Sequence, residues 1–312
     1  MDGRCGMSAS GRTVAMRDLD LSTIFRLACF SLTTANANAL CAFYESAFGC
    51  RRIATERLSG PNFEGLMGVQ GGALRVSLSL GLQVIELLQF DQAGRPYPKG
   101  ALASDLVFQH LAIVVKDMAP AYQRLLTVGG STPISRTGPQ RLPKSSGGVT
   151  AVKFRDPEGH PLELLSFPND NVPSIWRKES GGIFLGIDHS AISVSDTARS
   201  IAFYENLGFE VSARTLNQGS TQEMLDNLAG VRVEVTALKL SNATPHLELL
   251  CYRATTHDRV TARSHTDVAT TRLILQMRGA SNAKAGCASQ RNAVDPDGHH
   301  VLIVPAEEQL SA

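Results

Sequence analysis

A short segment of this chain recurs half a chain later, and this repeat constrains the fold more than any other feature. Residues 42–45 read Ala-Phe-Tyr-Glu and return as residues 202–205, an offset of 160 in a chain of 312 residues. In each copy an Asx residue that can cap a helix precedes the segment, and a glycine that can end a helix follows it. The caps are Asn36 and Asp196, the glycines are Gly49 and Gly208, and strand-like runs precede the caps at residues 27–32 and 189–194. Each half of the chain is therefore predicted to open with a strand and a helix.

Two further motifs recur in the sequence at spacings other than 160 residues. The pentapeptide Asp-Pro-Glu-Gly-His at residues 156–160 returns as Asp-Pro-Asp-Gly-His at residues 295–299. Because proline fixes φ and glycine tolerates a positive φ, this motif predicts the turn of a hairpin. A short apolar run with a single glutamate appears three times, at Glu86, Glu163 and Glu248. A carboxylate in a buried strand is costly unless it is paired or bound to a metal, so these glutamates are candidate functional residues.

Together the motifs divide the chain into four similar modules. Each module is predicted to be a β-α-β-β-β unit, so the fold class is α+β, and the fourth is shortened because it has no convincing helix. The modules span residues 24–90, 106–168, 186–252 and 268–305. We expect two domains, at residues 24–168 and 186–305, joined by a linker at residues 169–185, in line with roughly 150 residues per domain. Residues 1–22 are interpreted as a mobile leader.

Composition narrows the range of functions. Hydrophobic residues make up 43% of the chain and charged residues 19%, with a formal net charge of +1. This balance is typical of a soluble globular protein and provides no charge field for a nucleic acid or an anionic membrane. There is no apolar run of about 18 residues that would span a bilayer. The six cysteines have no CxxC pairing and no signal peptide precedes them, so we expect free thiols in a cytoplasmic protein.

The order of these motifs resembles the vicinal oxygen chelate superfamily, which includes glyoxalases, bleomycin resistance proteins and extradiol dioxygenases. The shared features are a first strand bearing a histidine, a helix with Phe-Tyr ahead of a glycine, and a last strand carrying a glutamate after an Asp-Pro-x-Gly turn. The resemblance covers nearly all of residues 24–305 and is weakest in the fourth module. It implies glyoxalase-like domains in which two modules form a cupped mixed sheet around one divalent transition metal: Fe, Ni, Co, Mn or Zn. The metal would chelate two adjacent oxygens of a small-molecule substrate, and the protein would be a monomer or a homodimer.

Carried over position by position, the ligand pattern of that superfamily is complete in only two modules. The histidine and glutamate positions hold His110 and Glu163 in the second module, His189 and Glu248 in the third, Cys29 and Glu86 in the first, and Arg272 and Leu302 in the fourth. If module one pairs with two and three with four, each domain holds half a metal site. If two pairs with three and one with four, one site is whole. We prefer the second pairing because it confines the losses to one place, and it predicts His110, Glu163, His189 and Glu248 as the metal ligands.

Three functions remain open. The first is a glyoxalase-like lyase or isomerase, in which Glu163 or Glu248 leaves the metal and shuttles a proton while the metal stabilises an enediolate. The second is an Fe(II) extradiol-type dioxygenase, which uses two histidines and one carboxylate. Lys153 at the tyrosine position of that branch, and the lack of a histidine in residues 145–152, weigh against it. The third is a non-catalytic protein that binds a small molecule and confers resistance.

Four other histidines have simpler interpretations. His160 and His299 close the Asp-Pro turns and are interpreted as turn residues. His246 and His300 stand two residues before the glutamate position of their modules, so they share a face with it. We interpret these two as solvated strand ends. The Phe-Tyr pairs of the two helices are expected to pack against the sheets.

Overall fold

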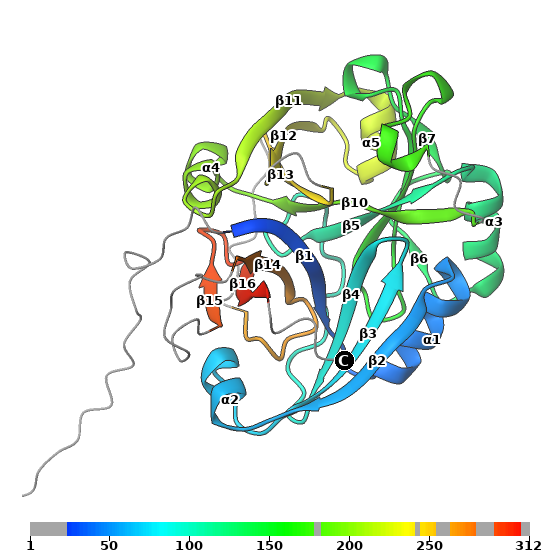
Figure 1. Ribbon diagram of the computed structural model, residues 1–312. Helices are drawn as coiled ribbons and strands as arrows, with labels where there is room; N and C mark the ends of the chain where they lie inside the picture. The colour runs from blue at the N-terminus through cyan, green and yellow to red at the C-terminus, as the bar shows by residue number, and fades with distance from the viewer. Residues whose placement is uncertain (1–23, 178–181, 241–243, 254–262, 279–289, 307–312) are drawn as a thin grey trace, which may run out of the picture.

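The computed structural model describes residues 24–177, 182–240, 244–253, 263–278 and 290–306. In these ranges the chain has an α+β fold with five α-helices and two mixed β-sheets (Figure 1). The helices are α1 (Ala37–Phe48), α2 (Pro61–Met67), α3 (Met118–Val128), α4 (Thr197–Glu205) and α5 (Ser220–Asp226). The predicted leader, Cys5 and Cys287 lie outside the described residues.

The first sheet, which we call sheet A, has the strand order β15-β16-β14-β1-β4-β3-β2. Its strands are β1 (Ile24–Thr33), β2 (Arg51–Leu58), β3 (Ala73–Leu80), β4 (Gln83–Phe90), β14 (Thr271–Met277), β15 (Arg291–Val294) and β16 (His300–Pro305). All of them belong to the first and fourth modules.

The second sheet, sheet B, has the order β11-β12-β13-β10-β5-β9-β8-β6, with β7 paired to β8. Its strands are β5 (Gln109–Val115), β6 (Thr132–Pro133), β7 (Gln140–Arg141), β8 (Thr150–Arg155), β9 (Pro161–Ser166), β10 (Phe184–Ser193), β11 (Glu210–Gln218), β12 (Arg232–Lys239) and β13 (His246–Tyr252). All of them belong to the second and third modules.

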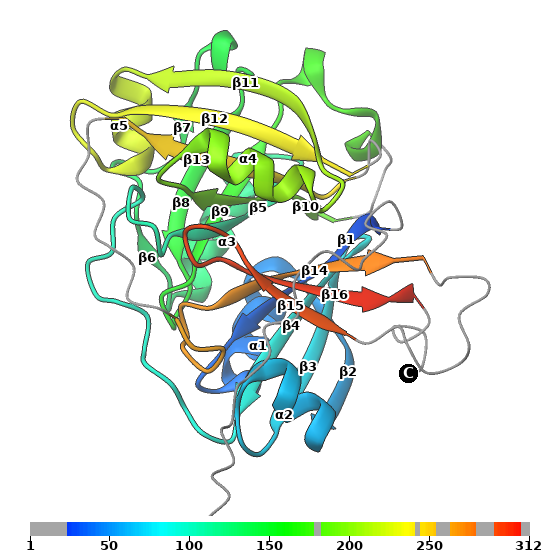
Figure 2. The same cartoon turned by 90° about the vertical axis from the view of Figure 1, so that its left-hand side faces the viewer.

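The sheets confirm the predicted pairing of module two with three and of module one with four. The first strands of the paired modules meet at the centre of each sheet, β1 against β14 and β5 against β10, and both pairs are antiparallel. Figure 2 shows the result, because the blue start and the red end of the chain lie together in one half of the molecule and the green and yellow middle forms the other. Each sheet is therefore built from both halves of the sequence.

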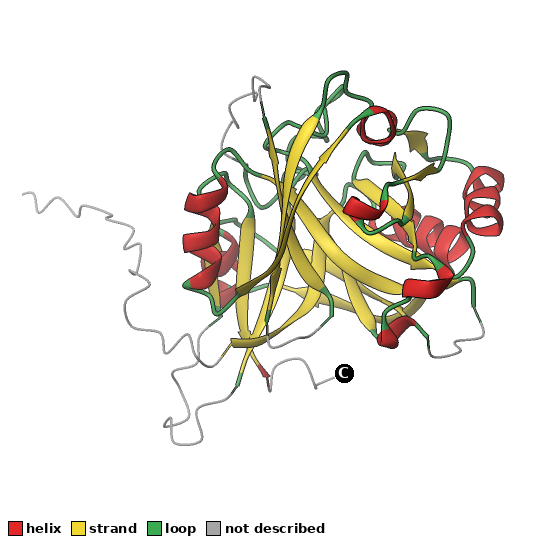
Figure 3. Cartoon of the chain, turned by 90° about the horizontal axis from the view of Figure 1, so that it is seen from above, coloured by secondary structure: helices red, strands yellow, loops and turns green. Residues whose placement is uncertain are grey.

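Alternation along the strands gives each sheet two distinct faces. Leu111, Ile113, Leu162 and Leu164 of sheet B belong to one large buried cluster that also takes in the apolar faces of sheet A, α1, α3 and α4. The residues between them point to the opposite face. We call this opposite face of each sheet its cup face. From above, helices are seen at both sides of the curved strands (Figure 3).

The predicted helix caps are present, with one difference. The Asn36 side chain accepts a hydrogen bond from the amide of Ala39, and Asp196 does the same from Arg199. Gly49 ends α1 with φ of 70°, a left-handed conformation that favours glycine. The second helix ends earlier than predicted, because α4 is capped by Asn206 and Gly208 lies in the turn beyond it.

The tyrosines of the repeated segment tie each helix to an Asp-Pro turn. The Tyr44 hydroxyl donates to Asp156 Oδ2 at 3.2 Å, and the Tyr204 hydroxyl donates to Asp295 Oδ2 at 3.2 Å. His160 is a turn residue, as predicted, since its amide donates to Asp156 Oδ1 at 3.0 Å. The two tyrosine hydrogen bonds run from module one to module two and from module three to module four, so they join the two sheets to each other.

No helix in the part of the chain that the structure describes is long and apolar enough to cross a membrane. The four cysteines in that part, Cys29, Cys41, Cys50 and Cys251, are free thiols. The expectation of free thiols is confirmed for these four.

Candidate functional site

The pairing of β5 with β10 creates a pseudo-symmetric arrangement on the cup face of sheet B. His110 on β5 stands opposite Ala191, and His189 on β10 stands opposite Ala112. The alanine facing each histidine leaves space for an imidazole ring. Glu163 on β9 is beside Ala112, as Glu248 on β13 is beside Ala191. The sheet thus places His110, Glu163, His189 and Glu248 on one face.

The four side chains are close to one another. His110 Nε2 lies 3.2 Å from Glu163 Oε2, and His189 Nε2 lies 3.6 Å from Glu248 Oε2. The centroids of the two imidazole rings are 5.7 Å apart. Metal–nitrogen and metal–oxygen bonds of about 2.0–2.2 Å place neighbouring ligand atoms about 3 Å apart, so both His–Glu separations suit ligands of one metal ion.

The surroundings of His110 suit a metal-binding histidine. Both ring nitrogens are buried and make no hydrogen bond of acceptable geometry within the described ranges, although Glu163 Oε2 lies 3.2 Å from Nε2. An orphaned buried nitrogen is costly, and a metal ion would satisfy it. Burial, opposed in part by Glu163, lowers the pKa of His110, so the ring is neutral and offers a lone pair. The residues present therefore fit a metal.

The second histidine is oriented by a carboxylate. His189 Nδ1 is 3.1 Å from Asp188 Oδ2, which leaves Nε2 directed at Glu248. A carboxylate on the far nitrogen is the usual way in which proteins fix a metal-binding imidazole. Burial would lower the pKa of His189, but Glu248 and Asp188 raise it to about 9. A metal ion would therefore have to displace a proton from this ring.

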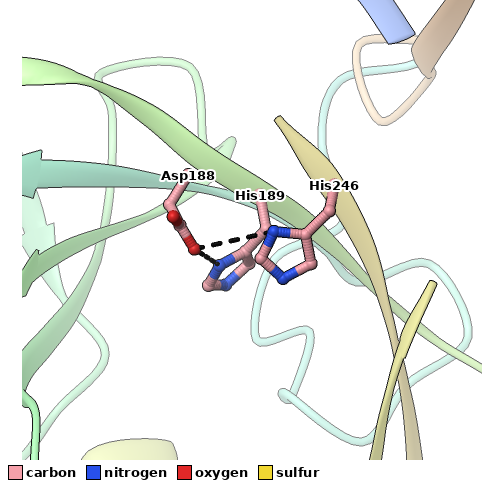
Figure 4. A group of neighbouring side chains, drawn as sticks. All are labelled: Asp188, His189 and His246. Atoms are coloured by element: carbon pink, nitrogen blue, oxygen red, sulfur yellow. Dashed lines mark hydrogen bonds and ion pairs between the residues drawn. The ribbon is translucent and has the colours of Figure 1, made fainter. Parts of the chain in front are cut away.

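His246 joins the same group and was wrongly interpreted as a solvated strand end. Its side chain is 12% exposed, with Nδ1 3.7 Å from Asp188 Oδ2 and Nε2 3.5 Å from Glu248 Oε1. Figure 4 shows Asp188, His189 and His246 facing one another, and their ligand atoms lie within 4.8 Å of one another. Burial would raise the pKa of Glu248, but His189 and His246 lower it to about 2, so this carboxylate is ionised.

A buried lysine completes the cup face of sheet B. Lys153 on β8 stands opposite Glu163, and its Nζ lies 3.9 Å from Glu163 Oε2 and 2.6 Å from Asp226 Oδ1 at the end of α5. Asp226 Oδ2 also accepts from Gln222 at 2.7 Å and from the Tyr252 hydroxyl at 3.1 Å. Burial would lower the pKa of Lys153, but Asp226 and Glu163 raise it, so the side chain is an ammonium.

The cup face of sheet A has the same register with different chemistry. Arg272 stands beside Ser31 as His110 stands beside Ala191, and Leu302 stands beside Ile274 as Glu163 stands beside Ala112. Arg272 has no exposed surface. Its Nε donates to His265 Nδ1 at 2.8 Å, and one Nη donates to Thr33 Oγ1 at 2.8 Å. A guanidinium has no lone pair for a metal, so Arg272 cannot serve as a ligand at the place that His110 takes in sheet B.

Sequence reasoning missed part of this constellation. Lys153 carried a usable signal, since it is a buried charged residue between the apolar Val152 and Phe154, much as the three glutamates stand in apolar runs. His246 was predicted to lie on the correct face of the sheet, but it was expected to be solvated and is only 12% exposed. Asp188 and Asp226 carried no signal, because nothing local in the sequence indicates which carboxylate will face the cup. His300 is also buried, at 5% exposure, and not solvated.

Comparison with known proteins places the chain in a family. Residues 26–164 and 186–312 match the model of the Glyoxalase/Bleomycin resistance protein/Dioxygenase superfamily. Glyoxalase I from Zea mays is similar in structure, with 15% sequence identity, a TM-score of 0.57, and coverage of 91% of this chain and 94% of that one. A putative dioxygenase from Bacillus subtilis has 12% identity and a TM-score of 0.51, with 91% and 86% covered. No curated protein matches in sequence. With two matched segments that together span most of its length, this chain belongs to the glyoxalase/bleomycin resistance protein/dioxygenase superfamily.

Proposed function

We propose that the cup of sheet B holds one divalent transition metal through His110, Glu163, His189 and Glu248. The observation that carries this proposal is His110, whose two buried nitrogens have no hydrogen-bond partner in the described part of the chain although two carboxylates and a second imidazole are near. Nitrogen and oxygen donors of this kind suit Fe, Ni, Co, Mn or Zn. Asp188 would orient His189 from outside the ligand set.

We further propose that the protein is a metal-dependent lyase or isomerase of the glyoxalase type, acting on a small substrate with vicinal oxygens. A metal bound here would act as a Lewis acid on those oxygens and stabilise an enediolate. The chain itself would supply the base that removes a proton from the adjacent carbon. Two histidines and two glutamates support this assignment over a dioxygenase, which needs only one carboxylate.

The surroundings of the two glutamates assign the base to Glu248. Glu163 is 8% exposed and held between His110 and the Lys153 ammonium. Glu248 is 22% exposed, has no lysine beside it, and lies 3.6 Å from His189 Nε2 and 3.5 Å from His246 Nε2. The carboxylate with fewer fixed charges around it moves more easily, so Glu163 serves as a permanent ligand and Glu248 as the proton carrier.

Metal content tests the ligand set. We expect the purified, metal-reloaded chain to hold roughly one metal ion, as a catalytic site of this type requires. His110→Ala and His189→Ala should abolish binding, because each removes one of the two imidazole ligands of the proposed site. Cys29 occupies in sheet A the register position that His189 occupies in sheet B. Cys29→Ala therefore serves as the control and should keep the metal. Elemental analysis gives the result, and stoichiometric metal in both histidine variants would refute the shared site.

Proton exchange tests the assignment of the base. With simple α-hydroxycarbonyl compounds in D₂O, the metal-loaded chain should exchange the hydrogen next to the carbonyl, measured by ¹H NMR. Glu248→Gln should keep the metal and reduce exchange by about 10²–10⁴-fold, the usual contribution of a positioned base. Glu163→Gln should lose the metal, because Glu163 is the permanent ligand in this proposal, and its loss of exchange should follow from the loss of metal. The same exchange rate in Glu248→Gln and wild type would contradict the assignment.

Two other outcomes would redirect the proposal. Oxygen consumption with catechols by the Fe(II)-loaded chain would favour the dioxygenase. A chain that stays nearly free of metal after reloading would exclude both catalytic functions and favour a protein that only binds a small molecule.

A further inference from the structure

Lys153 is a charged group buried inside the same cup as the proposed metal ligands. Its side chain is 4% exposed and reaches the cup face between Glu163 of β9 and Asp226 of α5. The charge of Glu248, across the sheet, also acts on it. The ammonium therefore lies among the ligands and not at the rim of the sheet.

The Lys153 ammonium does not use all of its hydrogen-bond donors within the described part of the chain. A lysine has three N–H donors. Among the residues that the structure describes, Lys153 Nζ has one acceptor within hydrogen-bond distance, Asp226 Oδ1 at 2.6 Å, while Glu163 Oε2 at 3.9 Å is too far. Asp226 is itself fixed by Gln222 and Tyr252. A rigidly held ammonium with unused donors in a buried cup is suited to bind an oxygen of a ligand.

The cup of sheet A shows that the fold does not require this polar group. Helices α2 and α5 have the same length, each follows a glycine, and each packs against the strand before the last one of the partner module, β15 for α2 and β8 for α5. The residues at equivalent places are Phe63 for Gln222, Met67 for Asp226, Phe90 for Tyr252, Asn292 for Lys153 and Leu302 for Glu163. Four of these five are apolar in sheet A, where most belong to a hydrophobic cluster.

The two cups therefore serve as an internal comparison. In sheet A, three of the four proposed metal ligands are replaced, by Cys29, Arg272 and Leu302, and the lysine, its aspartate and their two supports are absent too. Replacing a buried ion pair by hydrocarbon is often neutral or stabilising, so sheet B would not keep this ion pair for stability alone. Its presence beside the ligands points to a role in the function of that cup.

We propose that Lys153 is a substrate-binding residue that recognises a carboxylate next to the chelating oxygens. This inference rests on the proposed function, because it takes a bound metal as the second anchor. The substrate class that follows is a small 2-hydroxy or 2-oxo acid carrying a further carboxylate. Attraction between an ammonium and a carboxylate is much stronger in a buried site than in water, so this contact distinguishes such acids from neutral vicinal-oxygen compounds.

Two probe compounds that differ by one carboxylate test the inference. Glycolate offers a hydroxyl and a carboxylate to a metal, and tartronate offers the same pair plus a second carboxylate on the same carbon. Titration calorimetry on the metal-loaded full-length chain should show tartronate binding at least about 10-fold more tightly than glycolate, as expected for a charge-assisted hydrogen bond. Metal content is measured on the same samples.

The informative variant is the double substitution Lys153→Met with Asp226→Asn, which avoids a buried unpaired carboxylate. It should keep the metal and reduce the tartronate preference to about 2-fold or less. Asp226→Asn alone keeps the ammonium and should keep the preference. Lys116→Met, at an exposed position, is the control for loss of one charge and should behave as wild type.

The outcomes separate this inference from the proposed function. If the metal-loaded chain has no preference for tartronate, or if the double variant keeps it, Lys153 does not recognise a carboxylate and only the inference is overturned. Loss of the preference in Asp226→Asn, with metal retained, would also overturn it. A chain that takes up no metal overturns the proposed function, and the inference with it.

Discussion

Lowering the pH below about 6.5 is expected to destabilise this protein by about 3 kcal/mol per pH unit, because three buried histidines cannot take up a proton in the folded state. Burial lowers the pKa of His265 to about 2, and of His299 and His300 to about 3. The neighbouring Arg272 lowers the pKa of His265 and His300 further, and Arg263 does so for His299. His265 and His300 lie together beside Arg272, and His299 lies in the Asp-Pro turn of the fourth module, next to Ser193.

The direction follows from counting protons. A histidine in the unfolded chain has a pKa of about 6.5, so between about pH 6 and 4 the unfolded state binds three more protons at these sites. Burial raises the pKa of Asp295 to about 6, so the folded state binds one more there. The balance is about two protons, or about 2.7 kcal/mol per pH unit, present above pH 6.5 and lost as the pH falls. By about pH 4 the loss reaches about 5–7 kcal/mol, which equals the total stability of a protein at the low end of the typical range of about 5–15 kcal/mol.

Urea unfolding at pH 7.5, 6.5, 5.5 and 4.5, with a chelator present so that metal release does not contribute, measures this slope. His300→Asn should reduce it by about one proton, or about 1.4 kcal/mol per pH unit. His160→Asn is the control. Although burial opposes it, Asp156 raises the pKa of His160, so this ring is protonated in both states below pH 6 and does not affect the slope there. A constant unfolding free energy between pH 6.5 and 4.5 would contradict the prediction.

The second large effect concerns the ion pair between Lys153 and Asp226. Lys153→Met leaves the Asp226 carboxylate, which has no exposed side-chain surface, without its cation. Breaking a buried pair from one side costs about 3–5 kcal/mol. We therefore expect Lys153→Met to lower the free energy of unfolding by that amount at pH 7.5, measured by urea denaturation.

A double-mutant cycle isolates the interaction. In Lys153→Met with Asp226→Asn no buried charge is left unpaired, so most of the loss should be recovered, with a coupling energy of about 2–3 kcal/mol. Arg253→Met provides a matched control, because Arg253 pairs with Glu234 while its side chain is 50% exposed, and such a pair contributes at most about 1 kcal/mol. A cost for Lys153→Met no larger than for Arg253→Met would show that the buried pair does not stabilise the fold.

Much of the architecture could be predicted from the sequence. The offset of 160 residues, the Asp-Pro turns and the single glutamates gave four modules, and β1 and β4 start and end at residues 24 and 90, the predicted bounds of module one. Such signals are readable because caps, turns and strand alternation depend on residues near in sequence. The end of α4 was placed too late, since Asn206 caps the helix before Gly208 is reached.

Which modules share a sheet was inferred only indirectly, from where the histidines and glutamates survive. The strands show it directly, with β5 against β10 and β1 against β14. Such contacts join residues far apart in sequence, and no local pattern specifies them.

The sequence by itself determined the repeat, the positions of α1 and α4, the Asp-Pro turns, and the four residues proposed to hold the metal, whereas α2 and α5 were not predicted. Only the tertiary structure shows which charged groups surround these four residues. Asp188 and His246 lie next to His189, and Lys153, paired with Asp226, lies next to Glu163. The reason is that a charge is affected by every group within a few ångströms, whatever its place in the chain. Here α5 of one module brings its aspartate to a strand of another, and this contact distinguishes the two cups that the repeat made look alike.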